Sequence, residues 1–391
     1  MEQVVIVAAG RSPIGEFGGS LKSVSARELA THVVKEVVKK SGLSPEHINE
    51  LILGNCIQRT DEPNIARTVA IDAGFGNHVT GFTVQRQCSS GMQAIVNGVQ
   101  EILLGDSEIV VAGGVENMSN APYVLKTARW GNRLQHGQMT DTVWEILMDP
   151  HHQIMMGETA ERLADKYEIT REEQDEIAYL SHQKAIGAIE SGRFAEEIVP
   201  IPIKKKKETV FIDRDEHVRT DITLESLANL SPIFRKNGTV TAGNASGIND
   251  GAAAVVLMTE RKAKELNLEI IGKIKTYAWV GVEADLMGYG PVPATHKALK
   301  RAGYTLDDIQ LIEVNEAFAA QYLTVEKLLG LNREIVNVNG SGISLGHPIG
   351  CTGARIVISL LFEMKRRDLQ RGLATLCIGG GMGMSMIVER E

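Results

Sequence analysis

Two kinds of apolar pattern alternate at both ends of the chain. Short continuous apolar runs predict buried strands at 4–9, 51–54, 80–84, 108–114, 311–314, 335–339 and 373–378. Apolar residues spaced three and four apart predict helices between these runs, at about 25–40, 63–73, 92–103 and 351–367. Strands that are apolar throughout and alternate with helices are typical of an α/β sheet that is covered on both faces.

The order of these elements occurs twice. In 28–54 a helix is followed by a glycine, a short polar stretch and a strand, and 295–314 repeats this order. Such self-similarity predicts two duplicated α/β halves packed about a pseudo-two-fold axis. Polar helices at 158–167 and 171–191 interrupt the pattern, which predicts an insertion in the first half. We therefore expect an N-terminal half at 1–118, completed by about 247–270, an inserted loop domain at 119–246 and a C-terminal half at 271–391.

Charge and composition exclude several classes of protein. The chain has 391 residues and a net charge of −8, so it has no overall basic field for nucleic acid or an anionic membrane. An anionic substrate would need a local basic patch, and the basic residues of the insertion (204–207, Arg219, Arg235 and Lys236) are candidates, although such runs are commonly solvated surfaces. The sequence has no signal peptide, no apolar run long enough for a membrane span and no zinc-type cysteine spacing, so we expect a cytoplasmic, reduced protein without a metal.

Cys88 is the first candidate for chemistry. It lies where the predicted strand at 80–84 meets the predicted helix that ends near Gly105, and we expect it in the first turn of that helix. Free backbone N–H groups at a helix N-terminus favour an anion, which predicts a lowered thiol pKa and a reactive thiolate. Its neighbours Ser89, Ser90 and Gly91 are small enough to let a ligand approach. A small, buried, unreactive cysteine is the alternative.

The C-terminal half supplies possible partners for this thiol. Asn315, His347 and Cys377 all lie at the ends of predicted elements or in glycine turns, and 379–381 is a run of three glycines. His347 would accept the thiol proton, Cys377 would act as a second acid or base, and the glycine N–H groups would form an oxyanion hole. A packing histidine, a core cysteine and a tight strand turn remain the structural alternatives for the same residues.

Four motifs resemble the thiolases, the family of acetyl-CoA acetyltransferases and 3-ketoacyl-CoA thiolases. They are Gln87-Cys88-Ser89-Ser90-Gly91, Asn315-Glu316-Ala317-Phe318, Gly346-His347-Pro348-Ile349-Gly350 and Cys377-Ile378-Gly379-Gly380-Gly381-Met382-Gly383. The resemblance runs essentially end to end, through 112–119 and 242–246. It implies a thiolase-like fold in which the duplicated halves form αβαβα layers.

The resemblance also implies a role for each motif residue. Cys88 would be acylated, His347 would take its proton, and Cys377 would move the α-proton of a second thioester. One oxyanion hole would consist of His347 and a water held by Asn315, and the other of the backbone N–H groups of Cys88 and Gly379. The implied reaction is ping-pong: thiolysis of a 3-ketoacyl-CoA, or Claisen condensation of two acetyl-CoA molecules to acetoacetyl-CoA.

The implied partners are CoA and acyl-CoA as substrates, with no other cofactor, and further copies of this chain in a homotetramer, with 123–139 as the segment between chains. CoA would lie on the inserted domain, with Arg219 near its adenosine phosphate and Ser246 near its pantetheine. The apolar walls of the site would be Leu147, Met156, Phe234, Ala242 and Phe318. Short-chain thiolases commonly have a histidine where this chain has Met155, which leaves open an acetyl-CoA C-acetyltransferase or a broad-chain acyltransferase.

Three other classes of protein remain as alternatives. A β-ketoacyl synthase or hydroxymethylglutaryl-CoA synthase would lack the second cysteine in its glycine context. A non-catalytic acyl-CoA-binding protein would be expected to lose Cys88 or His347. A zinc protein is disfavoured by the cysteine spacing.

Overall fold

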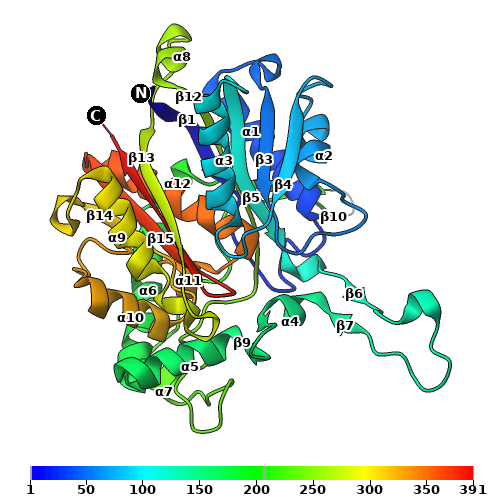
Figure 1. Cartoon of the computed structure of the whole chain (residues 1–391), viewed down its shortest axis with the longest axis vertical. Coiled ribbons are helices and arrows are strands. Elements are labelled where there is room, and N and C mark those ends of the chain that lie inside the picture. Colours follow the sequence, from blue (N-terminus) through cyan, green and yellow to red (C-terminus); the bar gives the residue numbers. More distant parts are fainter. Residues whose placement is uncertain (1, 206–207, 391) are drawn as a thin grey trace.

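The computed structural model describes residues 2–205 and 208–390, so part of the basic run at 204–207 lies outside the described residues. Its main feature is a ten-stranded sheet in the order β14-β15-β16-β13-β1-β12-β5-β3-β4, with the short β2 (Gly15–Glu16) beside β12. Figure 1 shows that this sheet has two parts, with helices between them and outside them.

Each half supplies one part of the sheet. In the N-terminal half β3 runs parallel to β4 and β5, while β12 is antiparallel to β5 and β1. In the C-terminal half β14 is parallel to β15, and β16 is antiparallel to β15 and β13. Only two residue pairs, Val5 with Lys273 and Ile6 with Gly272, join β1 to β13. The strands are β1 (Val4–Arg11), β3 (Glu50–Gly54), β4 (Thr80–Val84), β5 (Ile109–Asn117), β12 (Asn249–Thr259), β13 (Gly272–Gly281), β14 (Leu311–Val314), β15 (Arg371–Ile378) and β16 (Met382–Glu389).

Two helices fill the space between the parts of the sheet. α3 (Ser90–Leu104) and α12 (Ile349–Arg367) share one apolar core with residues of both parts. Every α12 residue from Ile349 to Met364 is buried, since this helix has sheet on both sides and α3 beside it. β5 and α12 come so close that a β-carbon on Gly114 would overlap the carbonyl oxygen of Gly350.

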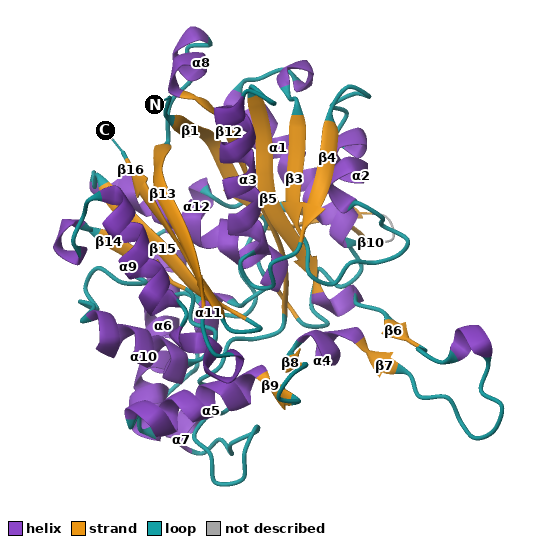
Figure 2. Cartoon of the chain, viewed as in Figure 1, coloured by secondary structure: helices purple, strands orange, loops and turns teal. Residues whose placement is uncertain are grey.

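The remaining helices cover the outer faces and complete the layers. α1 (Ala26–Ser41) and α2 (Ile65–Asp72) share a core with the N-terminal strands. α9 (Pro291–Ala302) and α10 (Ala319–Leu329) share another with the C-terminal strands. Helix and sheet therefore alternate in five layers, as Figure 2 shows, and the predicted αβαβα arrangement is confirmed.

The segment predicted as an insertion forms helices and hairpins whose apolar residues join the cores of both halves. It contains α4 (Thr142–Ile146), α5 (Met156–Tyr167), α6 (Arg171–Glu190), α7 (Leu224–Ala228) and the strand pairs β6 (Tyr123–Val124) with β7 (Thr140–Asp141), β8 (Met148–Asp149) with β9 (Ile154–Met155) and β10 (Ile201–Lys205) with β11 (Glu208–Ile212). The β6–β7 segment projects from the body as an arm (Figure 1). Two short helices, α8 (Glu260–Glu265) and α11 (Gly342–Leu345), complete the chain. The domain limits at 118, 246 and 270 stay a prediction.

The predicted strand at 335–339 is wrong. Only Val336 bridges β14, at Ile312, and Asn337 has a φ of 47°. The side chain of Asn337 takes the place of the ladder: its Oδ1 accepts the Val314 N–H at 2.8 Å and its Nδ2 donates to the Val314 carbonyl at 2.9 Å. An amide side chain therefore satisfies the edge of β14 where the strand at 335–339 was expected.

Within the described ranges, no helix combines the length and the apolar character needed to cross a membrane.

Candidate active site

Cys88 lies in a tight turn between β4 and α3. α3 begins at Ser90, so the expectation that Cys88 lies in the first helical turn is wrong by two residues. Gln87 has a φ of 45°, in the left-handed region, and its carbonyl accepts hydrogen bonds from the Ser90 hydroxyl at 2.7 Å and the Cys56 thiol at 3.1 Å. The Ser90 hydroxyl also accepts the Arg86 N–H at 2.8 Å. The side chains of Ser90 and Cys56 therefore hold the strained backbone of the turn that contains Cys88.

The expected lowering of the Cys88 pKa is also wrong. Burial raises the pKa of this thiol, and the backbone N–H groups of Gly379 and of Cys88 itself oppose the rise by stabilising the thiolate. The cost of removing the thiolate from water is larger than the stabilisation that these N–H groups supply. The free thiol therefore needs a nearby base.

His347 has the properties of such a base. It is 6% exposed, and burial, with a smaller contribution from Arg355, lowers its pKa to about 3, so its ring is neutral at neutral pH. Its Nδ1 lies 2.7 Å from the Thr352 hydroxyl, which itself donates to the Pro348 carbonyl at 2.9 Å. Because that hydroxyl has one proton and has donated it, it accepts from Nδ1–H. The proton therefore sits on Nδ1, and Nε2 keeps its lone pair, which accepts a long hydrogen bond from the Asn315 amide.

Asn315 and Asn249 place this ring. The Asn315 Nδ2 lies 3.4 Å from His347 Nε2, and its backbone N–H donates to the Thr375 carbonyl at 3.0 Å, which ties the end of β14 to β15. The buried Asn249 accepts the backbone N–H of His347 at 3.0 Å and donates to the Gly15 carbonyl at 3.0 Å. These contacts hold the histidine loop from both halves of the molecule.

Cys377 and Gly379 come from the end of β15. Cys377 is fully buried, and burial followed by the charge of Cys88 raises its pKa well above the usual value. A β-carbon on Gly379 would lie 3.5 Å from the Met156 sulfur and 3.8 Å from Gln87. Since the Gly379 N–H also acts on the Cys88 sulfur, the structure brings together Cys88, Cys377 and Gly379.

The histidine loop packs against the turn of Cys88. Cys88 packs against an apolar cluster that contains Ile349, two residues after His347. A β-carbon on Gly353, in the first turns of α12, would lie 2.6 Å from the Met92 nitrogen and 3.3 Å from the Ser89 carbonyl oxygen. The N-terminal ends of α3 and α12 therefore meet at the predicted site.

Most predicted apolar wall residues lie in two adjoining groups. Leu147, Met155 and Met156 belong to the β8–β9 hairpin, where the Met156 N–H donates to the Leu147 carbonyl at 2.9 Å. Phe234 and Phe318 form an edge-to-face pair with ring centroids 6.0 Å apart. The Phe234 ring covers Gly157, so this pair adjoins the hairpin.

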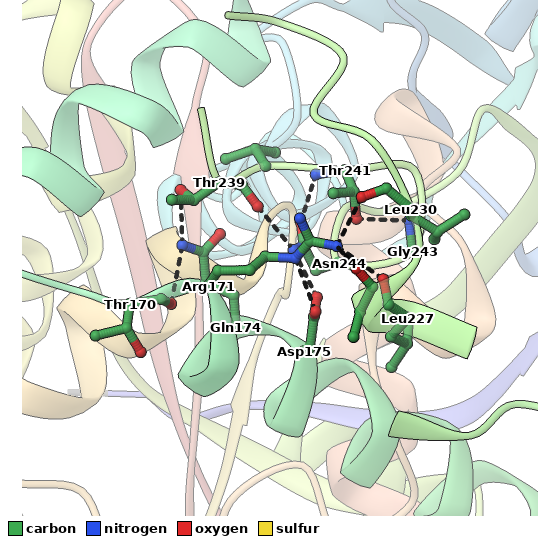
Figure 3. Close-up of polar contacts among 12 residues, drawn as sticks. Thr170, Arg171, Gln174, Asp175, Leu227, Leu230, Thr239, Thr241, Gly243 and Asn244 are labelled. Atoms are coloured by element: carbon green, nitrogen blue, oxygen red, sulfur yellow. Dashed lines mark hydrogen bonds and ion pairs between the residues drawn. The ribbon is translucent and has the colours of Figure 1, made fainter. Parts of the chain in front are cut away.

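The loop that contains Ala242 and Ser246 has its own supports. Figure 3 shows Asn244 at its centre: Nδ2 donates to Asp175 at 2.9 Å, and Oδ1 accepts the Thr241 N–H at 2.8 Å. The Ser246 N–H then donates to the Ala317 carbonyl at 2.9 Å, beside Phe318. Ser246 is half-buried and Ala242 is exposed.

Arg219 is exposed, and its backbone N–H donates to His182 at 3.1 Å. A β-carbon on Gly247 would contact the His217 ring, so the segment with Arg219 lies against the loop of Ser246.

No group of three or more His, Cys, Asp or Glu suited to a metal occurs in 2–205 and 208–390. Of the adjacent histidines 151 and 152, the latter pairs with Asp149 at 3.0 Å.

Sequence reasoning missed Thr352, Asn249, Cys56 and Glu116, all of which contact the turns that hold the site. Of these four residues, only Glu116 could have been noticed in the sequence. It comes just after the predicted apolar strand at 108–114, where a buried charged residue needs polar partners. Burial raises its pKa to about 7, while backbone N–H groups of Ile57, Cys56 and Gly350 oppose the rise.

Two family descriptions match nearly the whole chain: "Thiolase, N-terminal domain" at residues 4–261 and "Thiolase, C-terminal domain" at 268–390. The chain belongs to the thiolase family. Full-length relatives of this thiolase include the acetyl-CoA acetyltransferases of Syntrophomonas wolfei, 50% identical over 99% of both chains, and of Escherichia coli, 50% identical over 100% of both.

Solved structures agree with this assignment. The Bacillus anthracis acetyl-CoA acetyltransferase is 60% identical, with a TM-score of 0.98, covering 100% of this thiolase and 99% of that chain. Human mitochondrial 3-ketoacyl-CoA thiolase in complex with CoA is 43% identical, with a TM-score of 0.97, covering 100% and 98% of the two chains. The resemblance predicted from the four motifs and the thiolase fold predicted with it are confirmed.

Proposed function

We propose that this thiolase is an acetyl-CoA C-acetyltransferase, which transfers an acyl group between CoA thioesters through an acyl-Cys88 intermediate. The observation that carries the proposal is the Cys88 turn, where backbone N–H groups of Cys88 and Gly379 act on the sulfur and Cys377 adjoins it. The names of the relatives, acetyl-CoA acetyltransferase at about 50% identity, support the choice of substrate.

In the first half-reaction His347 Nε2 takes the proton of the Cys88 thiol. The sulfur attacks the thioester carbonyl, and the N–H groups of Cys88 and Gly379 hold the oxyanion. The C–S bond to CoA breaks, and the Cys377 thiol gives its proton to the leaving CoA. The neutral ring of His347 and the raised pKa of Cys377 suit these two roles, because the base begins unprotonated and the acid begins protonated.

In the second half-reaction the Cys377 thiolate removes an α-proton from acetyl-CoA. The protonated His347, with a water held by Asn315, stabilises the enolate oxygen. The enolate carbon attacks the acyl group, the bond to Cys88 breaks, and Cys88 recovers its proton from His347. The proton of Cys88 returns to it through His347, while Cys377 gives its own proton to CoA and takes the α-proton in its place. Both side chains thus regain their starting states, so the net reaction joins two acetyl-CoA into acetoacetyl-CoA and CoA, and its reverse is thiolysis.

The substrate would lie along the inserted domain. We assign the adenosine phosphate to Arg219, the pantetheine to Ser246 and the walls to Leu147, Met155, Met156, Phe234, Ala242 and Phe318. The human relative with CoA supports a CoA site, and the packing of Met156 beside Gly379 supports an apolar wall next to Cys88. The reaction requires no cofactor beyond its CoA thioesters, and we place it in the cytoplasm.

We further propose that the chain assembles as a homotetramer through its arm at 123–139. Trp130 is 92% exposed, Leu134 84% and Met139 67%, which is unusual for large apolar side chains on a monomer. Another copy of the chain would cover them. Light scattering at several protein concentrations tests the assembly, and a monomer at micromolar concentration would refute it.

Thiolysis of 3-ketoacyl-CoA substrates from four to sixteen carbons, by wild type and Cys88→Ala, tests the activity. We expect short chains to be cleaved fastest and the variant to be inactive. Cleavage of long chains as fast as short ones would assign a broad-chain acyltransferase, with Met155 in place of a histidine as its cause. A wild type inactive on every chain would refute the catalytic proposal.

A further inference from the structure

Glu116 joins two loops at the site although it lies on neither. It is 1% exposed near the end of β5, and its carboxylate accepts four hydrogen bonds. Oε1 accepts Asn55 Nδ2 at 2.9 Å and the Ile57 N–H at 3.0 Å, and Oε2 accepts the Cys56 N–H at 2.9 Å and the Gly350 N–H at 3.0 Å.

These donors come from both halves of the molecule. The Cys56 thiol donates to the Gln87 carbonyl, next to Cys88, so the first loop supports the nucleophile. Gly350 is in the first turn of α12, three residues after His347, so the second contact fixes the base. One carboxylate therefore connects the turn of Cys88 to the turn of His347.

We propose that Glu116 is a positioning residue, which sets the placement of His347 relative to Cys88. The proposal rests on the proposed acyl transfer for its kinetic readout. Glu116 itself touches no reacting atom. Its effect follows from geometry, because proton transfer and attack on a thioester lose about a hundredfold in rate when the reacting groups move by about 1 Å.

The four donors also specify the residue type. All four partners are N–H groups, which only acceptor oxygens can satisfy. In Glu116→Gln, an NH₂ group would face two N–H donors and push one loop away. In Glu116→Asp, the carboxylate would remain but would be one methylene too short to reach both loops.

The test compares wild type, Glu116→Gln and Cys56→Ala with a control, Glu363→Gln. Glu363 is likewise a buried carboxylate, with Asn339 at 2.8 Å and ion pairs to Arg366 and Arg367, but it lies about 20 Å along α12 from Gly350 and so away from the site. We expect kcat of Glu116→Gln to fall about a hundredfold with KM within threefold of wild type. Cys56→Ala should lose about fivefold, as one neutral hydrogen bond would predict. Glu363→Gln should lose thermal stability but keep kcat within twofold.

Alkylation of Cys88 by iodoacetamide gives a readout that needs no CoA. Loss of the Glu116 charge alone would lower the Cys88 pKa and favour alkylation, but its contribution is smaller than that of burial. We therefore expect Glu116→Gln to slow alkylation about tenfold at pH 7, and to slow it no further in a His347→Ala background, because the effect acts through the same pair. If wild type cleaves no thioester but alkylation still depends on Glu116, the proposed function fails and the positioning role stands.

Three results would overturn the proposal: a folded Glu116→Gln with kcat within threefold of wild type, additive effects of Glu116→Gln and His347→Ala on alkylation, or an equal loss of kcat in Glu363→Gln at equal loss of stability. If Glu116→Gln does not fold, Glu116→Asp replaces it, and wild-type kcat in that variant overturns the proposal as well.

Discussion

Replacing Thr352 by valine should test whether Thr352 holds His347 in the tautomer that its proposed role as a base requires. The Thr352 hydroxyl accepts the Nδ1–H of His347 at 2.7 Å and donates to the Pro348 carbonyl at 2.9 Å. Valine has nearly the same shape but neither bond. The Pro348 carbonyl keeps two other partners, the N–H groups of Cys351 and Thr352 at 2.9 Å, so the main loss falls on the histidine.

The size of the effect follows from the burial of the ring. A buried N–H without a partner costs about 1–3 kcal/mol. The ring avoids this cost by moving its proton to Nε2, which removes the lone pair that accepts the Cys88 proton. Either way the reactive tautomer loses about 1–3 kcal/mol, which corresponds to a fall of about 5- to 150-fold in kcat.

The assay is thiolysis of acetoacetyl-CoA by wild type, Thr352→Val and Thr352→Ser, with KM measured for each. The serine variant keeps the hydroxyl and should stay within about threefold of wild type, since only a methyl group is lost. A folded valine variant with wild-type kcat would show that Thr352 does not set the tautomer, and the assignment of His347 Nε2 as base would lose its physical support.

Three further predictions follow from pKa shifts and packing. Because burial raises the Cys88 pKa above its usual value of 9.0, alkylation of the His347→Ala variant, which lacks the proposed base, should become about tenfold faster per pH unit from pH 6 to 9, and a plateau below pH 8 in its rate of iodoacetamide labelling would contradict this. Burial lowers the His217 pKa from 6.5 to about 4, so between these pH values the folded state binds fewer protons than the unfolded state. The contribution of neutral His217 to the free energy of unfolding is therefore complete above pH 6.5 and is lost as the pH falls towards 4. In urea denaturation the advantage of wild type over His217→Gln should therefore shrink by up to about 3 kcal/mol from pH 7 to 4, whereas a constant difference would argue against it. Gly114→Ala should cost at least about 3 kcal/mol in free energy of unfolding, because the added methyl group meets the backbone of Gly350, and a thermal midpoint within 2 °C of wild type would show that β5 and α12 can separate.

The layers of the fold could be predicted because strands that are buried on both faces appear in the sequence as continuous apolar runs. β1 and β5 are apolar throughout, and α1 has its valines on one face, so each pattern had one interpretation. Three long strands, β12, β13 and β16, were not predicted. The residues of β13 are only partly buried and mix lysines with aromatics, whereas β12 and β16 are buried almost throughout and their apolar runs were overlooked. The segment at 335–339 has strand-like residues, but the amide of Asn337 bonds to β14 in place of a backbone ladder.

The candidate site likewise has features that the sequence predicts and features that depend on tertiary contacts. The motifs singled out Cys88, His347, Asn315 and Cys377 as candidates, since residue type and position at element ends suffice for that. The Cys88 pKa could not be predicted, because it depends on how far distant segments remove the sulfur from water. Thr352 contacts His347 and Pro348 in its own half, whereas Glu116 accepts N–H groups from both halves. Hydrophobic periodicity gives no information about either set of polar contacts.

The shared middle layer has a consequence for the molecule as a whole. α3 comes from one half and α12 from the other, and each helix closes the core of its neighbour's sheet as well as its own. The chain thus has the anatomy of an obligate dimer whose two subunits have been fused end to end. Cutting it near 266–270 should yield fragments that fold only on reassociation, because each half alone would expose the apolar residues of the shared core. For the same reason the intact chain should unfold in a single thermal transition.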